Sequence, residues 1–257
     1  MVFIQLIFLA RDNLASRLPV GSVTALSYGW WIQQVPETLI GTAIATALLP
    51  TLSEHVAAGE RTPFKETVER SLRVMIALSL PITVILSLTS LPLIQTAFGF
   101  PLEDAQMIQW ATQGYLIGLL GHSIVELGVR SFYASQNARV PMLVSGTGLL
   151  LYVGFAIPLM GVFGAGGIAL ANSISYTIQG LILFLILNKQ MPARFELRKT
   201  IFRSILSAGL AGLAAWLVFS VLPIPLSALY LSIGAIGFGL LVGAVPIWQE
   251  IRLLINL

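Results

Sequence analysis

The sequence predicts an all-α polytopic membrane protein with about eight transmembrane helices. Three observations lead to this prediction. Of the 257 residues, 56% are hydrophobic and only 10% are charged, and the mean hydropathy is +0.89. Apolar runs of about 20 residues, the length that spans a bilayer as a helix, recur along the whole chain. The basic residues lie in short segments between these runs, so the net charge of +3 follows the positive-inside rule and indicates no nucleic-acid partner.

Motifs for catalysis or metal binding do not occur. The chain has no cysteine, which excludes disulfides, thiolate metal sites and a cysteine nucleophile. Its two histidines, His55 and His122, have no metal-ligand spacing, and neither a GxSxG, an HExxH nor a P-loop motif is present. We therefore expect no metal, no cofactor and no catalytic residues, in a protein that is not an enzyme.

The first apolar run, residues 1–10, covers only about 15 Å as a helix, roughly half of a bilayer core. Either this helix continues through Arg11 and Asp12 to about Leu18, or its start is missing. Adjacent residues point about 100° apart on a helix, so we expect that Arg11 and Asp12 do not neutralise each other along one face. At membrane depth they need other partners, whereas in the headgroup region they do not.

Residues 22–55 form a second candidate span around which we expect the chain to be organised. A helical projection places polar or small residues on one face: Ser27, Trp31, Gln34, Thr38, Gly41, Thr42 and Ala45. Lipid tails form no hydrogen bonds with such a face, so we predict that it faces a cavity or neighbouring helices. Pro36 lies mid-span and predicts a kink, as in a helix that bends during transport. A kinked packing seam of small residues explains the same pattern equally well.

The rest of the chain predicts a loop and six further spans. Residues 54–73 are rich in charge and predict an aqueous loop with a short amphipathic helix, which has Pro63 in its first turn. The further spans are expected at about 72–97 (interrupted at Pro81 and Pro92), 105–127, 140–160, 166–187, 201–222 and 226–248. Acidic residues favour the start of the fourth span, at about residue 105. A glycine-rich tight turn is expected after the fifth span, 140–160, and the sixth span, 166–187, is unusually polar. The short turn 221–227 joins the last two, and three residues are expected as interfacial anchors: Trp216, Tyr230 and Trp248.

The basic residues predict the orientation. With eight spans, residues 54–73, 128–140 and 188–203 and the tail after Trp248 fall on one side of the membrane. These segments hold twelve of the fourteen lysines and arginines. The positive-inside rule then places them, and the C-terminus, in the cytoplasm.

Charged residues within the spans are candidate functional residues, because burying a charge in lipid costs free energy. His122, Glu126 and Arg130 share one face of the fourth span, and Glu126 there suggests proton or cation handling. An internal hydrogen-bonded cluster near the cytoplasmic interface is the other interpretation. Glu37, one turn after Gln33 on the second span, raises the same two possibilities.

Several stretches together resemble the lipid II flippase family, called MurJ or MviN, of the MOP transporter superfamily. The most specific is NLASRLPVGSVTALSYGWWIQQVPETLIGTAIATALLPTLSE, residues 13–54. Three shorter stretches also match: FPLED (100–104), RSFYASQNARVP (130–141) and GVFGAGGIALANSIS (161–175). The resemblance covers essentially the whole chain but only the second half of the family's usual length. It implies that residues 1–188 are a MOP/MATE-like second six-helix lobe with a partial first helix, and that 189–257 are two additional C-terminal transmembrane helices.

The resemblance also implies a function. Proteins of this family are thought to move lipid-linked peptidoglycan precursor to the outer leaflet of the bacterial inner (cytoplasmic) membrane by alternating access. The implied partners are a lipid-linked oligosaccharide, membrane lipid and a complementary N-terminal lobe. The substrate-binding residues would be Arg11, Asp12, Trp31, Gln34, Glu37, Thr38 and Thr42. The residues that act in gating, or in coupling to protons or cations, would be Pro36, His122, Glu126 and Arg130. The cytoplasmic hinge would contain Phe132, Tyr133, Arg139 and Pro141.

The sequence departs from the family pattern at positions that matter for binding. Trp31 stands where the family commonly has an arginine, Asn137 replaces the usual acid of the hinge, and Arg11 and Asp12 occur in reversed order. A tryptophan can stack on a sugar but cannot pair with a diphosphate. We therefore expect this chain to be incomplete without an N-terminal lobe. Two alternatives remain open: an exporter of another polyprenyl-linked oligosaccharide, and a non-transporting membrane scaffold.

Overall fold

The computed structural model describes residues 2–221 and 228–255, and every regular element within these ranges is a helix. The helices of the first half are α1 (Val2–Ala15), α2 (Ser22–Glu37), the π-helix η1 (Thr38–Thr42), α3 (Ala43–Ala57), α4 (Arg61–Ala97) and α5 (Leu102–Leu116). Those of the second half are α6 (Leu119–Ala134), α7 (Arg139–Gln190), α8 (Arg198–Val221), α9 (Ala228–Ala244) and α10 (Trp248–Ile255). The all-helical prediction is confirmed for the described residues.

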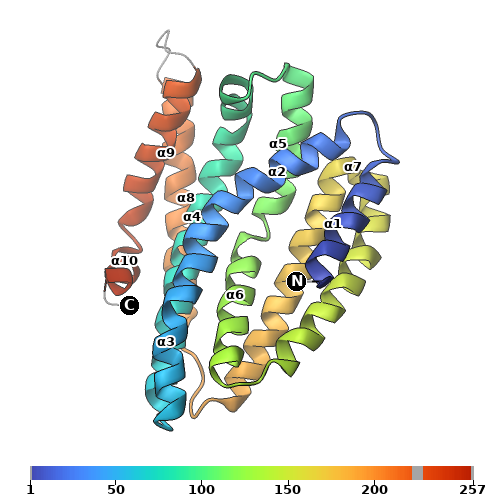
Figure 1. Ribbon diagram of the computed structural model, residues 1–257. Helices are drawn as coiled ribbons and strands as arrows, with labels where there is room; N and C mark the ends of the chain where they lie inside the picture. The colour runs from blue at the N-terminus through green and yellow to red at the C-terminus, as the bar shows by residue number, and fades with distance from the viewer. Residues whose placement is uncertain (1, 222–227, 256–257) are drawn as a thin grey trace.

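The helices run beside one another and their connections gather at two opposite ends (Figure 1). The turn between α3 and α4, the connection between α6 and α7 and the link between α7 and α8 lie at one end, which we call the basic end. The connections from α1 to α2 and from α4 to α5 lie at the other end, with the reversal inside α7. This alternation is the one that the sequence predicts. The predicted turn 221–227 falls mostly outside the described residues.

Four helical stretches are long and apolar enough to cross a membrane: 22–57, 61–97, 139–190 and 198–220. A fifth exists if α9 and α10, which meet at 97°, count as one broken span. The longest stretch, α7, has 52 residues and would extend about 78 Å if it were straight, more than twice a bilayer core. Gly164, with φ 57° and ψ −133°, divides it into two arms at the predicted tight turn. The helical membrane fold is confirmed, and the count of eight crossings stays a prediction.

Helix α4 runs without interruption from Arg61 to Ala97, so the predicted helix in 54–73 is present but continuous with the next span, and the predicted breaks at Pro81 and Pro92 are wrong. Only residues 58–60 separate α3 from α4, and Pro63 does lie in the first turn. Each internal proline removes one N–H donor, but a long helix packed against neighbours keeps its remaining hydrogen bonds and continues. α4 accordingly packs against α5, α6, α8 and α9.

The fourth predicted span is two helices, α5 and α6, which break at residues 117–118 and continue to Ala134. The break lets the second arm of α7 approach closely. A Cβ atom on Gly118 would lie 2.7 Å from the Cα of Ser173, closer than real contacts allow. The Ser173 hydroxyl shares its single proton between the carbonyls of Gly114 (2.6 Å) and Tyr115 (3.0 Å). Both carbonyls belong to the last turn of α5, and that of Tyr115 also accepts a hydrogen bond from the Gly118 N–H at 3.0 Å.

The last predicted span ends earlier than expected, because α9 stops at Ala244 and Trp248 begins the separate helix α10. The carboxylate of Glu250 holds α10 against the bundle. Its Oε1 lies 3.4 Å from Arg73 of α4 and 3.5 Å from Arg203 of α8, and the carboxyl group is buried. The three expected anchors are exposed side chains, Trp216, Tyr230 and Trp248, and their depth in a membrane stays a prediction.

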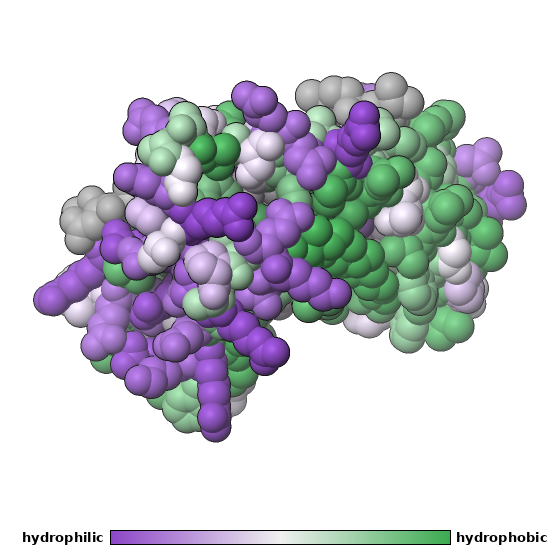
Figure 2. All heavy atoms as spheres, turned by 90° about the horizontal axis from the view of Figure 1, so that it is seen from below, coloured by the Kyte–Doolittle hydropathy of each residue, from purple (hydrophilic) through white to green (hydrophobic). Residues whose placement is uncertain are grey.

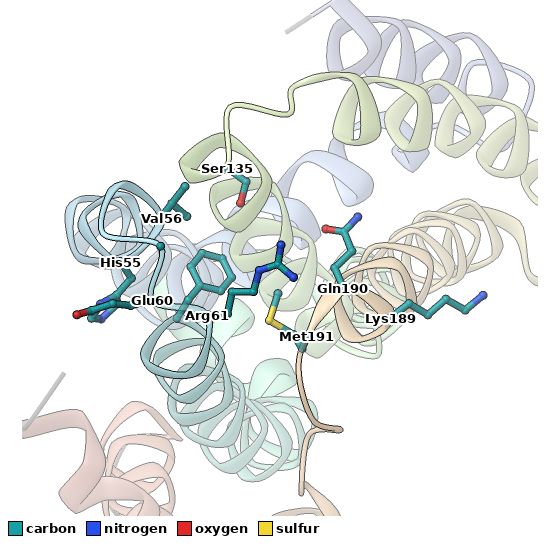
Figure 3. Close-up of a pocket in the computed structure, with 10 residues that line it drawn as sticks. His55, Val56, Glu60, Arg61, Ser135, Lys189, Gln190 and Met191 are labelled. Carbon is teal, nitrogen blue, oxygen red and sulfur yellow. The ribbon is translucent and has the colours of Figure 1, made fainter.

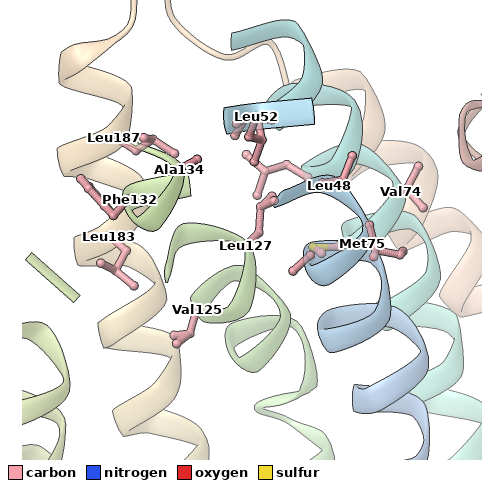
Figure 4. Packing of buried hydrophobic residues seen from close by; sticks show 14 of the residues in the cluster. Leu48, Leu52, Val74, Met75, Val125, Leu127, Phe132, Ala134, Leu183 and Leu187 are labelled. Atoms are coloured by element: carbon pink, nitrogen blue, oxygen red, sulfur yellow. The ribbon is translucent and has the colours of Figure 1, made fainter. Parts of the chain in front are cut away.

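Two clusters of buried hydrophobic side chains hold the bundle together. The first lies towards the basic end and joins α3, α4, α6 and α7 (Figure 4) through residues such as Leu52, Met75, Phe132 and Leu183. The second joins α1, α2, α5 and α7 through residues such as Leu26, Tyr115 and Ile168. Between these clusters, α2 passes into η1, where the candidate site begins.

Candidate functional site

The site is built on the irregular helix formed by α2, η1 and α3. Pro36 lacks the N–H that an α-helix needs at this position, and the backbone widens into a π-helix from Thr38 to Thr42. Such π-turns are rare and occur frequently at functional sites. Pro36 is itself buried, and the π-helix begins two residues after it, whereas the kink predicted at Pro36 stays a prediction.

Four predicted substrate-binding residues form one hydrogen-bonded network across this turn. The Gln34 side-chain amide donates to Oε2 of Glu37 at 2.7 Å and lies 3.2 Å from the Thr38 hydroxyl. The Thr42 hydroxyl donates to the other oxygen of Glu37, at 3.2 Å. Glu37 is only 5% exposed, so its carboxylate depends on these donors for stabilisation. We call Gln34, Glu37, Thr38 and Thr42 the Glu37 network.

The Glu37 network faces α6. A Cβ atom on Gly41 would lie 2.9 Å from Oε1 of Glu37 and 3.1 Å from the Cα of Ser123, so the two helices touch with no room for a side chain. Further along α6, Glu126 and Arg130 form an ion pair at 3.1 Å. Both charges lie close enough to act electrostatically on Glu37. The structure thus brings together three predicted ionisable residues from two helices.

His122 belongs to a different, buried cluster. Its ring stacks on Tyr176 with centroids 3.6 Å apart, and its Nε2 lies 3.1 Å from Oδ1 of Asn172. The edge of Trp30 contacts the same ring. The sequence analysis assigned no role to Asn172 or Tyr176. Both lie in the sixth predicted span, whose unusual polarity was the feature that could have indicated them.

Arg11 and Asp12 pair with each other, so the expectation that these neighbours do not neutralise each other is wrong. The Arg11 Nη2 lies 2.8 Å from Oδ1 of Asp12, because the long arginine side chain folds back along the helix. The Arg11 side chain is 10% exposed, and its guanidinium covers the Phe8 ring and lies 3.5 Å from the Ser27 hydroxyl of α2. Among the hydrogen bonds of the described residues, none joins this pair to the Glu37 network.

The predicted polar face of α2 is partly uncovered in this chain. Trp31 is 59% exposed and Thr38 is exposed, beside the exposed apolar residues Val35 and Leu39. The preceding residue, Trp30, instead packs inward against Phe8 and Tyr115. An open face that mixes polar, aromatic and apolar groups suits contact with an amphiphile or with another helical lobe.

The predicted hinge residues flank the short connection 135–138 between α6 and α7. Phe132 is 1% exposed and belongs to the core cluster of Figure 4, whereas Tyr133 is exposed. Arg139 is the first residue of α7, and Pro141 lies in its first turn. Within the described residues, no group of three His, Asp or Glu side chains is arranged to hold a metal ion.

Comparison with known proteins assigns the family. The family model described as lipid II flippase MurJ matches residues 1–243. The chain belongs to the lipid II flippase MurJ family. It is 30% identical over 224 residues to the lipid II flippase MurJ of Burkholderia cenocepacia, covering 82% of this chain and 42% of that protein. It is also 29% identical over 195 residues to the probable lipid II flippase MurJ of Bdellovibrio bacteriovorus, covering 75% and 37% respectively.

Solved structures show the same fold. The chain is similar to lipid II flippase MurJ in an inward closed conformation, with a TM-score of 0.81 and 21% identity, covering 99% of this chain and 52% of that one. A multidrug resistance MATE family transporter of the MOP superfamily, in an outward-facing conformation, is similar with a TM-score of 0.62 and 17% identity, covering 97% and 62%. The chain therefore has the MurJ and MATE type of helical membrane fold, and it spans less than half the length of the curated MurJ relatives that it matches.

Proposed function

We propose that this chain is the C-terminal lobe of a lipid II flippase that works by alternating access together with an N-terminal lobe. The observation that supports this most directly is coverage, because nearly all of the chain superimposes on about half of a MurJ structure. On this proposal residues 1–188 form the six-helix lobe and residues 189–257 form the two additional helices. The protein transports and does not catalyse, in the inner membrane, with its C-terminus in the cytoplasm.

The proposed substrate site lies on the exposed face of α2 and η1 around Trp31 and Thr38, and it includes the buried side chains of Arg11 and Glu37. A lipid-linked diphosphate sugar needs hydrogen-bond donors and positive charge at its headgroup, while its polyprenyl tail stays in lipid. The Glu37 network supplies hydroxyl and amide groups, Trp31 supplies a ring that stacks on a sugar, and Arg11 with Asp12 supplies an ion pair that can exchange partners.

The proposed coupling and hinge groups lie next to this site. Protonation or cation binding at Glu126, with Arg130 and Glu37 in electrostatic range, would shift the contact between η1 and α6. His122 would position α6 against α7, and Pro36 would permit α2 to bend. The hinge would lie around residues 135–138, between Phe132 and Tyr133 on one side and Arg139 and Pro141 on the other.

Complementation of a flippase-depleted bacterial strain tests this proposal. The chain should restore growth when it is co-expressed with a matching MurJ N-terminal lobe, and neither part should do so alone. A pair that assembles in the membrane and fails to restore growth would contradict lipid II transport. Assembly without transport would instead support a non-transporting membrane scaffold.

Export of another polyprenyl-linked oligosaccharide is the second candidate, because the exposed position 31 carries tryptophan where the family commonly has arginine. If position 31 contacts the headgroup, Trp31→Arg in the two-lobe protein adds a cation and should raise the affinity for a diphosphate lipid about tenfold. The measurement is lipid binding by the purified pair, with Val35→Arg on the same exposed face as the control. An unchanged or weaker affinity would place the headgroup elsewhere.

A further inference from the structure

A pocket of about 620 Å³ lies at the basic end of the molecule. Its walls come from the turn between α3 and α4, the start of α4, the end of α6 and the end of α7. These segments are far apart in the sequence and far along the helices from the Glu37 network (Figure 1). The residues that matter for its chemistry are Arg61, Phe64, Ser135, Lys189, Gln190 and Met191.

The charge of this pocket is positive and unbalanced. Arg61 and Lys189 line it, and among the described residues neither forms an ion pair. Glu60 is the one acid among the described lining residues, and its Oε2 already lies 3.0 Å from Nδ1 of His55. By contrast, Lys65 on the first turns of α4 is neutralised by Glu69 at 2.6 Å.

The polar groups of the pocket converge on one space. Figure 3 shows Arg61 extending between the start of α4 and the end of α7, with the hydroxyl of Ser135 and the amide of Gln190 around the same space. The Lys189 side chain extends away from Arg61, as Figure 3 shows, and it also lines a second hollow with Met191 and Arg194. The Arg61 guanidinium and the Gln190 amide are donors that suit phosphate oxygens, whereas the Ser135 hydroxyl already donates to the Ser131 carbonyl at 3.1 Å.

Apolar side chains line the remainder of the pocket. Phe64 is 4% exposed and forms part of its wall with Met191 and Val56. A volume of about 620 Å³ falls within the range of small-molecule sites and exceeds what a phosphate group alone fills. Hydrophilic residues gather over this end of the molecule beside a hydrophobic flank, as Figure 2 shows from below. The ligand therefore has a phosphate joined to a less polar body.

We propose that this pocket, the Arg61 pocket, binds an organic phosphate ester. Its phosphate accepts hydrogen bonds from Arg61 and Gln190, Lys189 adds a second positive charge at the edge, and its carbon body packs on Phe64 and Met191. The headgroup of an anionic phospholipid and a soluble phosphate ester share this chemistry. The inference does not depend on the proposed transport function, because none of these residues belongs to the candidate substrate site.

Calorimetric titration of the purified full chain in detergent tests this inference. The probes are short-chain phosphatidylglycerol, short-chain phosphatidylcholine and glycerol 1-phosphate. Arg61→Gln combined with Lys189→Gln removes both pocket cations. Arg70→Gln combined with Lys199→Gln removes the same charge from exposed residues outside the pocket. A thermal unfolding midpoint close to that of the unmodified chain verifies that each double variant is folded.

The unmodified chain should bind phosphatidylglycerol or glycerol 1-phosphate more tightly than phosphatidylcholine. The pocket variant should lose about tenfold or more in affinity for that probe, and the control variant should keep it. Binding of phosphatidylglycerol alone identifies a lipid headgroup, and binding of glycerol 1-phosphate identifies a soluble ester. Equal losses in the two double variants, equal binding of phosphatidylcholine, or no binding to either anionic probe would overturn the proposal.

Discussion

At the scale of single residues, Glu37 is the residue on which the hydrogen-bonded network of the candidate site depends most. Its buried carboxylate is held by donors from Gln34, which precedes the π-helix η1, and from Thr42, the last residue of η1. A side chain that satisfies two donors in a buried position is difficult to replace, because its removal leaves both without that acceptor. Glu37 therefore stabilises the π-helix η1 as well as presenting a charge near α6.

Replacing Glu37 should separate these two roles. Glu37→Ala should lower the free energy of unfolding by about 1–3 kcal/mol, whereas Glu37→Gln keeps one acceptor oxygen and should cost less. Unfolding in a denaturing-detergent titration measures both values. Glu66→Ala, which removes an exposed acid from α4, is the control and should change stability by less than about 0.5 kcal/mol. Equal losses in Ala and Gln variants would contradict the hydrogen-bonding role.

The sequence identified the residues of the Glu37 network but not their partners. A projection at 100° per residue groups Gln34, Thr38 and Thr42 because they lie on one continuous helix. It cannot find the stacking of His122 on Tyr176, because Tyr176 lies on the second arm of α7, remote from His122 in the sequence. It also misjudged Arg11, whose flexible side chain reaches the adjacent Asp12 even though their Cβ atoms diverge.

At the scale of elements, the close approach of α6 and α7 depends on glycine. The break between α5 and α6 places Gly118 against Ser173, whose hydroxyl shares its proton between two carbonyls of α5. The contact needs a residue without a side chain, because a Cβ atom there would meet the backbone of α7. Backbone cannot move aside as the end of a flexible side chain can.

Alanine at two glycines should therefore have opposite effects. Gly118→Ala should lower the free energy of unfolding by about 1–3 kcal/mol, because the added methyl group overpacks the contact. Gly154→Ala, in the first arm of α7, meets nothing within 4 Å and should raise stability by up to about 1 kcal/mol through lower backbone entropy of the unfolded chain. The detergent titration measures both. A stable Gly118→Ala variant would show that α7 can move away from α6.

The sequence predicted that the helices exist more reliably than it predicted where each helix begins and ends. Hydropathy located the helical stretches, since apolar runs of sufficient length require backbone hydrogen bonding within the helix. It did not predict that α4 continues through Pro81 and Pro92, because the tolerance of an internal proline depends on packing against other helices. The break at residues 117–118 was also missed, because its stabilising partner Ser173 is remote in sequence.

At the scale of the whole molecule, the connections alternate between two ends, and twelve of the fourteen basic residues belong to segments at or near one of them. The MurJ family model matches most of the chain, which spans less than half of its relatives. The face of α2 that carries Trp31 is uncovered. These features support the proposal that the chain is one lobe of a larger transporter, and this proposal makes two predictions at this scale.

The orientation can be measured by cysteine labelling, because the chain has no natural cysteine. Ala58→Cys lies in the turn between α3 and α4, and Leu102→Cys lies at the opposite end, at the start of α5. A membrane-impermeant maleimide should label Leu102→Cys in intact spheroplasts and Ala58→Cys only after permeabilisation. The reverse pattern would place the basic end outside the cytoplasm.

The central claim is that this lobe moves lipid II only together with an N-terminal lobe. The most direct measurement is flipping of labelled lipid II in proteoliposomes that contain the chain alone, the N-terminal lobe alone or both. The account predicts headgroup exposure to the opposite leaflet only with both lobes, and a reduced rate when Glu37→Ala is present. Flipping by the chain alone, or none by a pair that has assembled, would contradict it.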